Sequence, residues 1–157
     1  MGRRTRSSSM LALSLSVVLS SGCGQQVDSL AMPPDKRQYD TARLVRGETS
    51  FNQYCASCHG EGATGAADWR IRDDSGRFPP PPLNGTGHAW HHPLEQLRRT
   101  INDGGPAGQS NMPAWGDTLS GEQIDDMIAW FQSLWPGPIY EAWYGIEERA
   151  QQRTKGP

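Results

Sequence analysis

The segment Cys55-Ala56-Ser57-Cys58-His59 constrains the fold of this chain more than any other feature. Two thiols three residues apart, followed directly by a histidine, form the pattern that attaches a c-type haem covalently. At this spacing each sulfur can form a thioether with one vinyl group of the porphyrin, and the imidazole can bind the iron. A zinc site or a redox dithiol is the alternative, but the chain has no second Cys-x-x-Cys pair and no βαβ pattern. The segment predicts one haem c, with its iron, as the cofactor.

The start of the chain predicts export. Residues 1–22 combine a basic start with an apolar stretch that is too short to remain in a bilayer. They end before Cys23 in a pattern that resembles a bacterial lipoprotein signal, in which the cysteine is lipidated and begins the mature chain. We therefore expect a protein that is lipid-anchored through Cys23 on the periplasmic side of the bacterial inner membrane. Ordinary signal cleavage, which would give a soluble periplasmic protein, is the alternative.

The charge of the chain restricts its partners. Removal of the signal takes away three of the 15 basic residues and none of the 17 acidic ones, so the mature chain is more acidic than the net charge of −2 of the full sequence. An acidic surface argues against nucleic acid as a ligand. We expect redox proteins as partners, although the sequence names neither the electron donor nor the acceptor.

The order of elements predicts an all-α domain. A helix is expected from Tyr39 or Thr41 into the haem motif, and Pro93 is placed to begin another. Ser120 and Gln123 form a capping box ahead of an apolar stripe at helical spacing. Glycine and proline dominate the stretch from Gly60 to Trp90, where a long loop is acceptable because a haem offers a flat apolar face to wrap.

Four segments follow from these patterns: a signal peptide at 1–22, a tether at 23–40, a haem domain at 41–136 and a C-terminal helical extension at 137–157. The haem domain is expected to have three to four core helices and long Gly/Pro-rich loops wrapped around one haem. The extension could pack on the domain or present Trp143 and Tyr144 to a partner.

A methionine is the candidate for the second axial position of the iron. Two of the five methionines leave with the signal, Met32 is in the tether, and Met127 belongs to the apolar stripe of a helix. Met112 remains, in a loop that Pro113 stiffens. A thioether favours ferrous over ferric iron and fills the last coordination position, as in an electron carrier. A core-filling role for Met112 is the alternative.

With these residues in place, the chain resembles the class I cytochromes c. Gly47, Phe51 and Cys55 follow one another at intervals of four, as in the N-terminal helix of that family. The segment 127–131 resembles its C-terminal helix, in which an aromatic residue crosses the N-terminal helix at the glycine. Because Gly47 lacks a Cβ atom, the two helices can approach closely with Trp130 over the gap.

The resemblance extends over residues 42–135 and implies further site residues. The segment 111–115 is similar to the axial-methionine loop of the family. By the same resemblance the carbonyl oxygen of Pro81 accepts a hydrogen bond from Nδ1 of His59, and the side chain of Leu83 contacts the haem ring.

Several polar residues lie outside this pattern. His88, His91 and His92 could form a copper or zinc site, or replace Met112 on the iron. The alternative is a structural role, in which His88 or Trp90 hydrogen-bonds a haem propionate while His91 and His92 cap the next helix. Four loop residues could also contact propionates or simply be solvated; they are Trp69, Arg70, Arg72 and Arg77.

These observations favour electron transfer by a single haem with His59 and Met112 as ligands, and they argue against an enzyme in its own right. One alternative is the haem subunit of a periplasmic dehydrogenase or oxidase complex. Another is a haem-based or copper-binding sensor or metal-handling protein.

Overall fold

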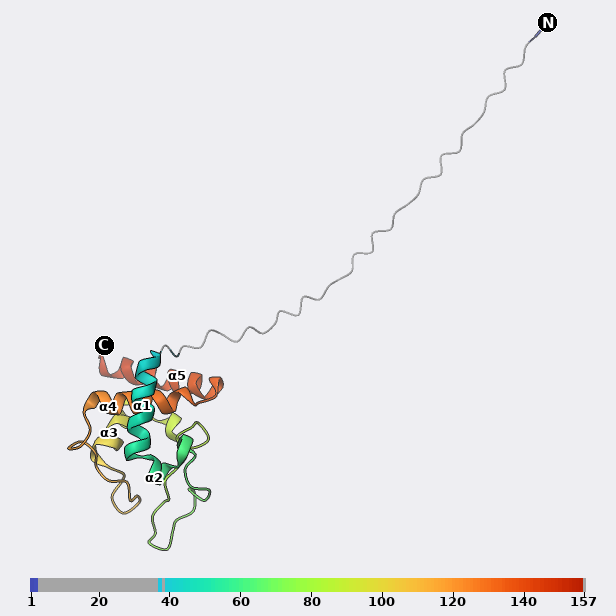
Figure 1. Ribbon diagram of the computed structural model, residues 1–157. Helices are drawn as coiled ribbons and strands as arrows, with labels where there is room; N and C mark the ends of the chain where they lie inside the picture. Colours follow the sequence, from blue (N-terminus) through green and yellow to red (C-terminus); the bar gives the residue numbers. More distant parts are fainter. Residues whose placement is uncertain (3–36, 38, 157) are drawn as a thin grey trace. The chain divides into compact units, whose positions relative to one another are not determined.

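The computed structural model describes residues 1, 2, 37 and 39–156 (Figure 1). Cys23, nearly all of the expected signal and most of the expected tether lie outside the described residues. Within 39–156 the structure contains helices and no strand, and the all-α prediction is confirmed. The α-helices are α1 (Thr41–Tyr54), α2 (Ala56–His59), α3 (Leu94–Asp103), α4 (Gly121–Ser133) and α5 (Gly137–Thr154), with short 3-10 helices η1 (Glu61–Ala63) and η2 (Ala89–His91).

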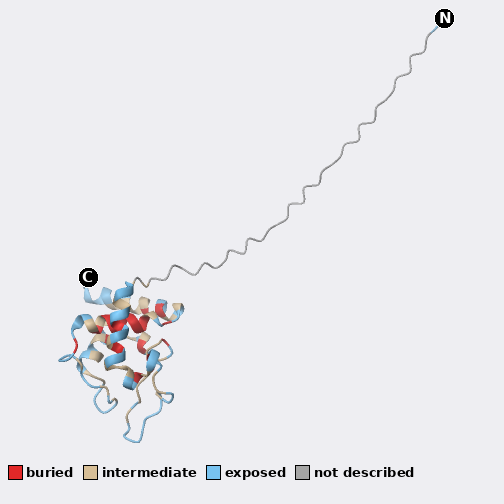
Figure 2. Ribbon diagram, in the orientation of Figure 1, coloured by how far each residue is buried: buried red, intermediate tan, exposed pale blue. Residues whose placement is uncertain are grey.

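The crossing of α1 and α4 forms the centre of the domain. A Cβ atom on Gly47 would lie 2.1 Å from the carbonyl oxygen of Asp126 and 2.8 Å from Cβ of Trp130. The rings of Phe51 and Trp130 lie with their centroids 4.5 Å apart beside this contact. Buried residues concentrate along α4 and where α1 crosses it (Figure 2). Glycine at position 47 therefore sets the distance between the two helices.

A cluster of ion pairs stabilises the crossing of α1 and α4. Asp126 is 4 % exposed, and its carboxylate accepts from Nε of Arg43 at 3.0 Å and from Nε of Arg46 at 2.7 Å. Arg43 also donates to the carbonyl oxygen of Asp125. A buried carboxylate is tolerable when its oxygens are satisfied in this way, because an unpaired buried charge is costly.

Helix α4 begins at the capping box that the sequence predicts. The Ser120 side chain accepts from the backbone N–H of Gln123, and the Gln123 side chain accepts from the backbone N–H of Ser120. At the other end of the helix, Arg37 donates to the carbonyl oxygens of Gln132 at 3.4 Å and Ser133 at 3.3 Å. Both ends of α4 thus have partners for backbone groups that the helix itself leaves unpaired.

Helix α5 packs on the domain. Trp135, Tyr140 and Trp143 are each 6 % exposed or less and lie with ring centroids 5.2–6.5 Å apart. The indole N–H of Trp143 donates to the carbonyl oxygen of His92 at 3.0 Å. Trp143 is therefore part of the core, and α5 is the longest helix of the described part of the chain.

A carboxylate of α5 caps α3. Helix α3 follows Pro93, which provides no side-chain cap, and the backbone N–H of Leu94 donates to Oε2 of Glu147 at 2.7 Å. The expectation that His91 and His92 cap this helix is wrong, because the acceptor is Glu147 of α5, which lies 53 residues after Leu94 in the chain. A carboxylate also interacts favourably with the positive end of the helix dipole.

We expect Glu147→Ala to lower the free energy of unfolding by about 1 kcal/mol, the usual cost of losing an N-terminal cap. The measurement is urea unfolding of the haem-loaded protein. Glu148→Ala is the matched control, because this neighbouring side chain is exposed and its loss should cost less than about 0.5 kcal/mol. Equal losses in the two variants would show that the Glu147 contact does not stabilise α3.

Candidate haem site

The two cysteines of the haem motif lie at the junction of α1 and α2. Cys55 ends α1, where its backbone N–H donates to the carbonyl oxygen of Phe51 at 2.8 Å, and it also begins α2. One helical turn later, Cys58 is exposed, and neither thiol forms a disulfide. Burial raises the pKa of the Cys55 thiol to about 11, with a smaller contribution from Cys58. Both sulfurs are thus free thiols on one short helical segment.

His59 follows at the end of α2 and is buried, with 8 % exposure. Its Nδ1 lies 2.9 Å from the carbonyl oxygen of Pro81. Burial lowers the pKa of His59, and the Pro81 contact offsets part of this effect. A neutral imidazole with Nδ1 engaged in this way has Nε2 as the nitrogen that would bind iron.

Tight backbone packing places Pro81 beside His59. The Gly65 N–H donates to the His59 carbonyl oxygen at 2.6 Å, and the Ala66 N–H donates to that of Pro80 at 2.9 Å. Gly65 has a φ of +66°, and a Cβ atom there would lie 2.5 Å from the carbonyl carbon of Pro81. Only glycine fits this close approach.

Leu83 lies two residues beyond the Pro81 carbonyl and is half-buried against the core. Its backbone N–H donates to the carbonyl oxygen of Ala63 at 2.8 Å, and its carbonyl oxygen accepts from the indole N–H of Trp135 at 2.7 Å. These contacts connect the loop after His59 to the core formed by α4 and α5.

Met112 lies in the loop between α3 and α4 and is half-buried. Its backbone N–H donates to Oγ of Ser110 at 3.0 Å, and its carbonyl oxygen accepts from the Gly105 N–H at 3.0 Å. The other methionine in the described part of the domain, Met127, is 1 % exposed on α4, with its sulfur 3.9 Å from Sγ of Cys55. Met127 is therefore a core residue next to Cys55.

The residues of this site fit a covalent haem c. Two thiols one helical turn apart match the vinyl attachment, and the buried neutral imidazole after them suits iron. The contact with the Pro81 carbonyl engages Nδ1, so Nε2 is the ring nitrogen left for the iron. The long segment between η1 and η2 contains no regular element, as expected of loops that wrap a flat ligand.

Two of the remaining histidines stack with tryptophans, and His92 lies edge-on to the ring of His88. The ring of His88 lies on Trp69 with centroids 5.3 Å apart, and that of His91 lies on Trp90 at 3.6 Å. The indole N–H of Trp90 donates to the carbonyl oxygen of Gly87 at 3.1 Å. Within the described residues, no three His, Cys, Asp or Glu side chains are grouped so that they could hold a metal ion. The geometry gives no support to a copper or zinc site here.

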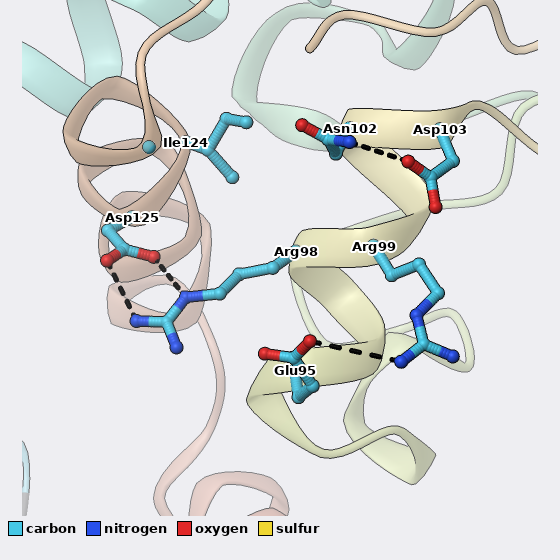
Figure 3. A pocket seen from close by; sticks show the side chains of 8 residues that line it. Glu95, Arg98, Arg99, Asn102, Asp103, Ile124 and Asp125 are labelled. Atoms are coloured by element: carbon cyan, nitrogen blue, oxygen red, sulfur yellow. Dashed lines mark hydrogen bonds and ion pairs between the residues drawn. The ribbon is translucent and has the colours of Figure 1, made fainter.

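A surface pocket between α3 and α4 is not part of the haem site (Figure 3). Arg98 reaches across it to Asp125 in a two-point ion pair, and Arg99 lies 3.9 Å from Glu95 on its own helix. The charges that line the pocket thus have partners within it, and none of the lining residues belongs to the haem motif.

Comparisons with known proteins place the chain in a family. The family model described as "Cytochrome C oxidase, cbb3-type, subunit III" matches residues 42–131. The chain belongs to this family of class I cytochromes c. It accordingly binds a single covalent haem c, and the function of the family is haem electron transfer. None of the helices in the described part of the chain has the length and apolar character needed to span a bilayer.

The individual proteins that are similar to this chain are also cytochromes c or cytochrome c oxidase subunits. The cbb3-type cytochrome c oxidase subunit FixP of Sinorhizobium medicae is 28 % identical over 118 residues, 71 % of this chain and 36 % of the relative. Cytochrome c-555 of Prosthecochloris aestuarii is 30 % identical over 106 residues, 61 % of this chain and 89 % of the relative. The chain thus spans about a third of the FixP and CcoP relatives but nearly the whole length of cytochrome c-555.

The fold also matches a solved structure. The crystal structure of cytochrome CL from Methylophaga aminisulfidivorans superimposes with a TM-score of 0.50 at 22 % sequence identity, over 66 % of this chain and 61 % of that one. This match supports the cytochrome c fold.

Proposed function

We propose that this chain is a single-haem electron carrier whose iron is held by His59 and Met112, and that it works on the periplasmic side of the bacterial inner membrane. The observation that carries the ligand assignment is the oriented His59 ring, with Nδ1 2.9 Å from the Pro81 carbonyl oxygen. Met112 is the partner ligand because it lies on a loop, whereas Met127 is buried in α4. Lipid attachment at Cys23 remains part of the proposal.

The haem iron supplies the one-electron couple between its ferric and ferrous states. The residues around the iron would limit the structural rearrangement that accompanies this change of oxidation state. The carbonyl of Pro81 fixes the His59 ring and increases the basicity of the ligand, while the thioether of Met112 favours the ferrous state. Because the Pro81 carbonyl already holds the His59 ring, this ligand has little to rearrange when the electron enters or leaves.

We expect the reduced, haem-loaded protein not to bind carbon monoxide at neutral pH, because both axial positions of the iron are filled by side chains. The measurement is the visible spectrum before and after addition of the gas, together with a redox titration that should follow a one-electron curve. Carbon monoxide binding by the unmodified protein would favour the alternative of a gas-binding sensor and would contradict the proposed ligand set.

A second candidate is a haem subunit of a larger oxidase complex. The observation that favours it is the set of FixP and CcoP relatives, which are named as subunits of cbb3-type oxidases. A subunit would co-purify from membranes with partner proteins in fixed ratio to its haem. A free carrier would be recovered alone after lipid extraction, or in the soluble fraction if Cys23 carries no lipid.

A further inference from the structure

We propose that Arg77 is a positioning residue for Met112, and that it acts through Asn111 to hold the methionine sulfur in the geometry that binds iron. This inference rests on the proposed assignment of Met112 as the axial ligand. It concerns the side chain that keeps the ligand in place.

The contact joins two loops that are far apart in the sequence. Nη1 of Arg77 donates to Oδ1 of Asn111 at 2.7 Å, across 34 residues. The next residue along, Phe78, donates its backbone N–H to the carbonyl oxygen of Gln109 at 2.9 Å. Two consecutive residues of one loop therefore hold two residues of the other, and Asn111 immediately precedes Met112.

The loop that carries Met112 needs such support. Residues 104–114 contain no charged side chain and no regular secondary structure. The hydrogen bonds that Met112 itself makes, to Ser110 and Gly105, stay within this segment. They shape the loop, but they do not fix where it lies relative to the rest of the domain. The bonds from Arg77 and Phe78 reach it from outside.

The position of this loop affects the equilibrium between Met112 bound to the iron and Met112 released from it. An added ligand can occupy the iron only while Met112 is released, so its apparent affinity is proportional to the released fraction. A contact that holds the loop in place lowers that fraction. Removing the Arg77 contact should therefore tighten the binding of an external ligand without any change in the haem itself.

The test uses imidazole as the external ligand, titrated into the oxidised, haem-loaded full-length protein at fixed pH and followed by absorbance. We expect Arg77→Gln to bind imidazole about fivefold more tightly than the unmodified protein, the factor for the net contribution of one ordinary hydrogen bond. Asn111→Ala should have the same effect. The double variant should bind no more tightly than either single one, because both changes remove the same contact.

Arg72→Gln is the matched control. Arg72 lies in the same loop as Arg77, but it donates to the carbonyl oxygen of Gly76 and lies over the ring of Phe78, so it makes no hydrogen bond to the methionine loop. Its imidazole affinity should stay within about twofold of the unmodified protein. A purely structural role for Arg77 would lower the unfolding midpoint and leave the imidazole affinity unchanged.

Three results would overturn the inference: an unchanged affinity in Arg77→Gln, an equal increase in Arg72→Gln, or additive effects in the double variant. Met112→Ala separates this failure from that of the ligand assignment. If Met112→Ala binds imidazole no more tightly than the unmodified protein, Met112 is not the ligand. If it binds far more tightly while Arg77→Gln does not, the ligand assignment stands and the positioning role fails.

Discussion

Gly47→Ala is expected to lower the free energy of unfolding of the haem-loaded protein by about 3 kcal/mol. The added methyl group would lie 2.1 Å from the carbonyl oxygen of Asp126 and 2.8 Å from Cβ of Trp130. Neither neighbour is the free end of a flexible side chain, so α1 and α4 have to move apart. That movement also disturbs the Phe51–Trp130 contact and the ion pairs of Asp126.

Gly145→Ala is the matched control for this substitution. Gly145 lies inside α5, and a Cβ atom there would meet only the end of the Arg149 side chain, at 3.4 Å. Because alanine is the better helix former, this variant should be unchanged or more stable by about 0.5–1 kcal/mol. Urea unfolding of both proteins checks the difference. If both variants unfold at the same urea concentration, the close approach at Gly47 does not control the packing of the two helices.

The elements that the sequence predicts well are those with local signals. The Ser120 and Gln123 capping box and the apolar stripe that follows it mark α4, and both are found. The crossing at Gly47 is also found, but it follows from the resemblance to the class I cytochromes c, whereas the capping box and the apolar stripe are local signals. Such signals are readable because the interacting residues are either adjacent or repeat with the helical period.

The contacts that the sequence leaves open join segments far apart in the chain. The spacing of aromatic residues in α5 is the same for a helix that packs on its own domain and for one that binds a partner protein. The sequence therefore does not predict that Trp143 is buried. The capping of α3 by Glu147 and the bond from Arg77 to Asn111 depend on how loops and helices meet in space. A charged residue in a glycine-rich loop carries no local signal of its partner, and most such residues are solvated.

Met112→Ala has the largest expected effect on the chemistry of the protein. Loss of the thioether removes the ligand that favours ferrous iron, so the reduction potential should fall by on the order of 0.1 V or more, within the range of about 0.8 V over which axial ligands set haem potentials. The sixth position becomes open to water and to added ligands. Because Met112 is only half-buried on a loop, the fold itself should survive the change.

Met127→Leu is the matched control, since it removes a methionine sulfur that lies 3.9 Å from Cys55 but belongs to the core of α4. A volume-conserving change of this kind should cost less than about 1.5 kcal/mol of stability and should leave the iron ligands in place. Its potential should match that of the unmodified protein. A large fall in potential in Met127→Leu, with none in Met112→Ala, would reverse the two assignments.

The absorption spectrum of the oxidised protein tests the assignment of His59 and Met112 most directly, through the charge-transfer band from methionine sulfur to ferric iron. We expect the unmodified protein and Met127→Leu to show a low-spin haem spectrum with this band, and Met112→Ala to lack it. Absence of the band from the unmodified protein, or its persistence in Met112→Ala, would contradict the proposed ligand set.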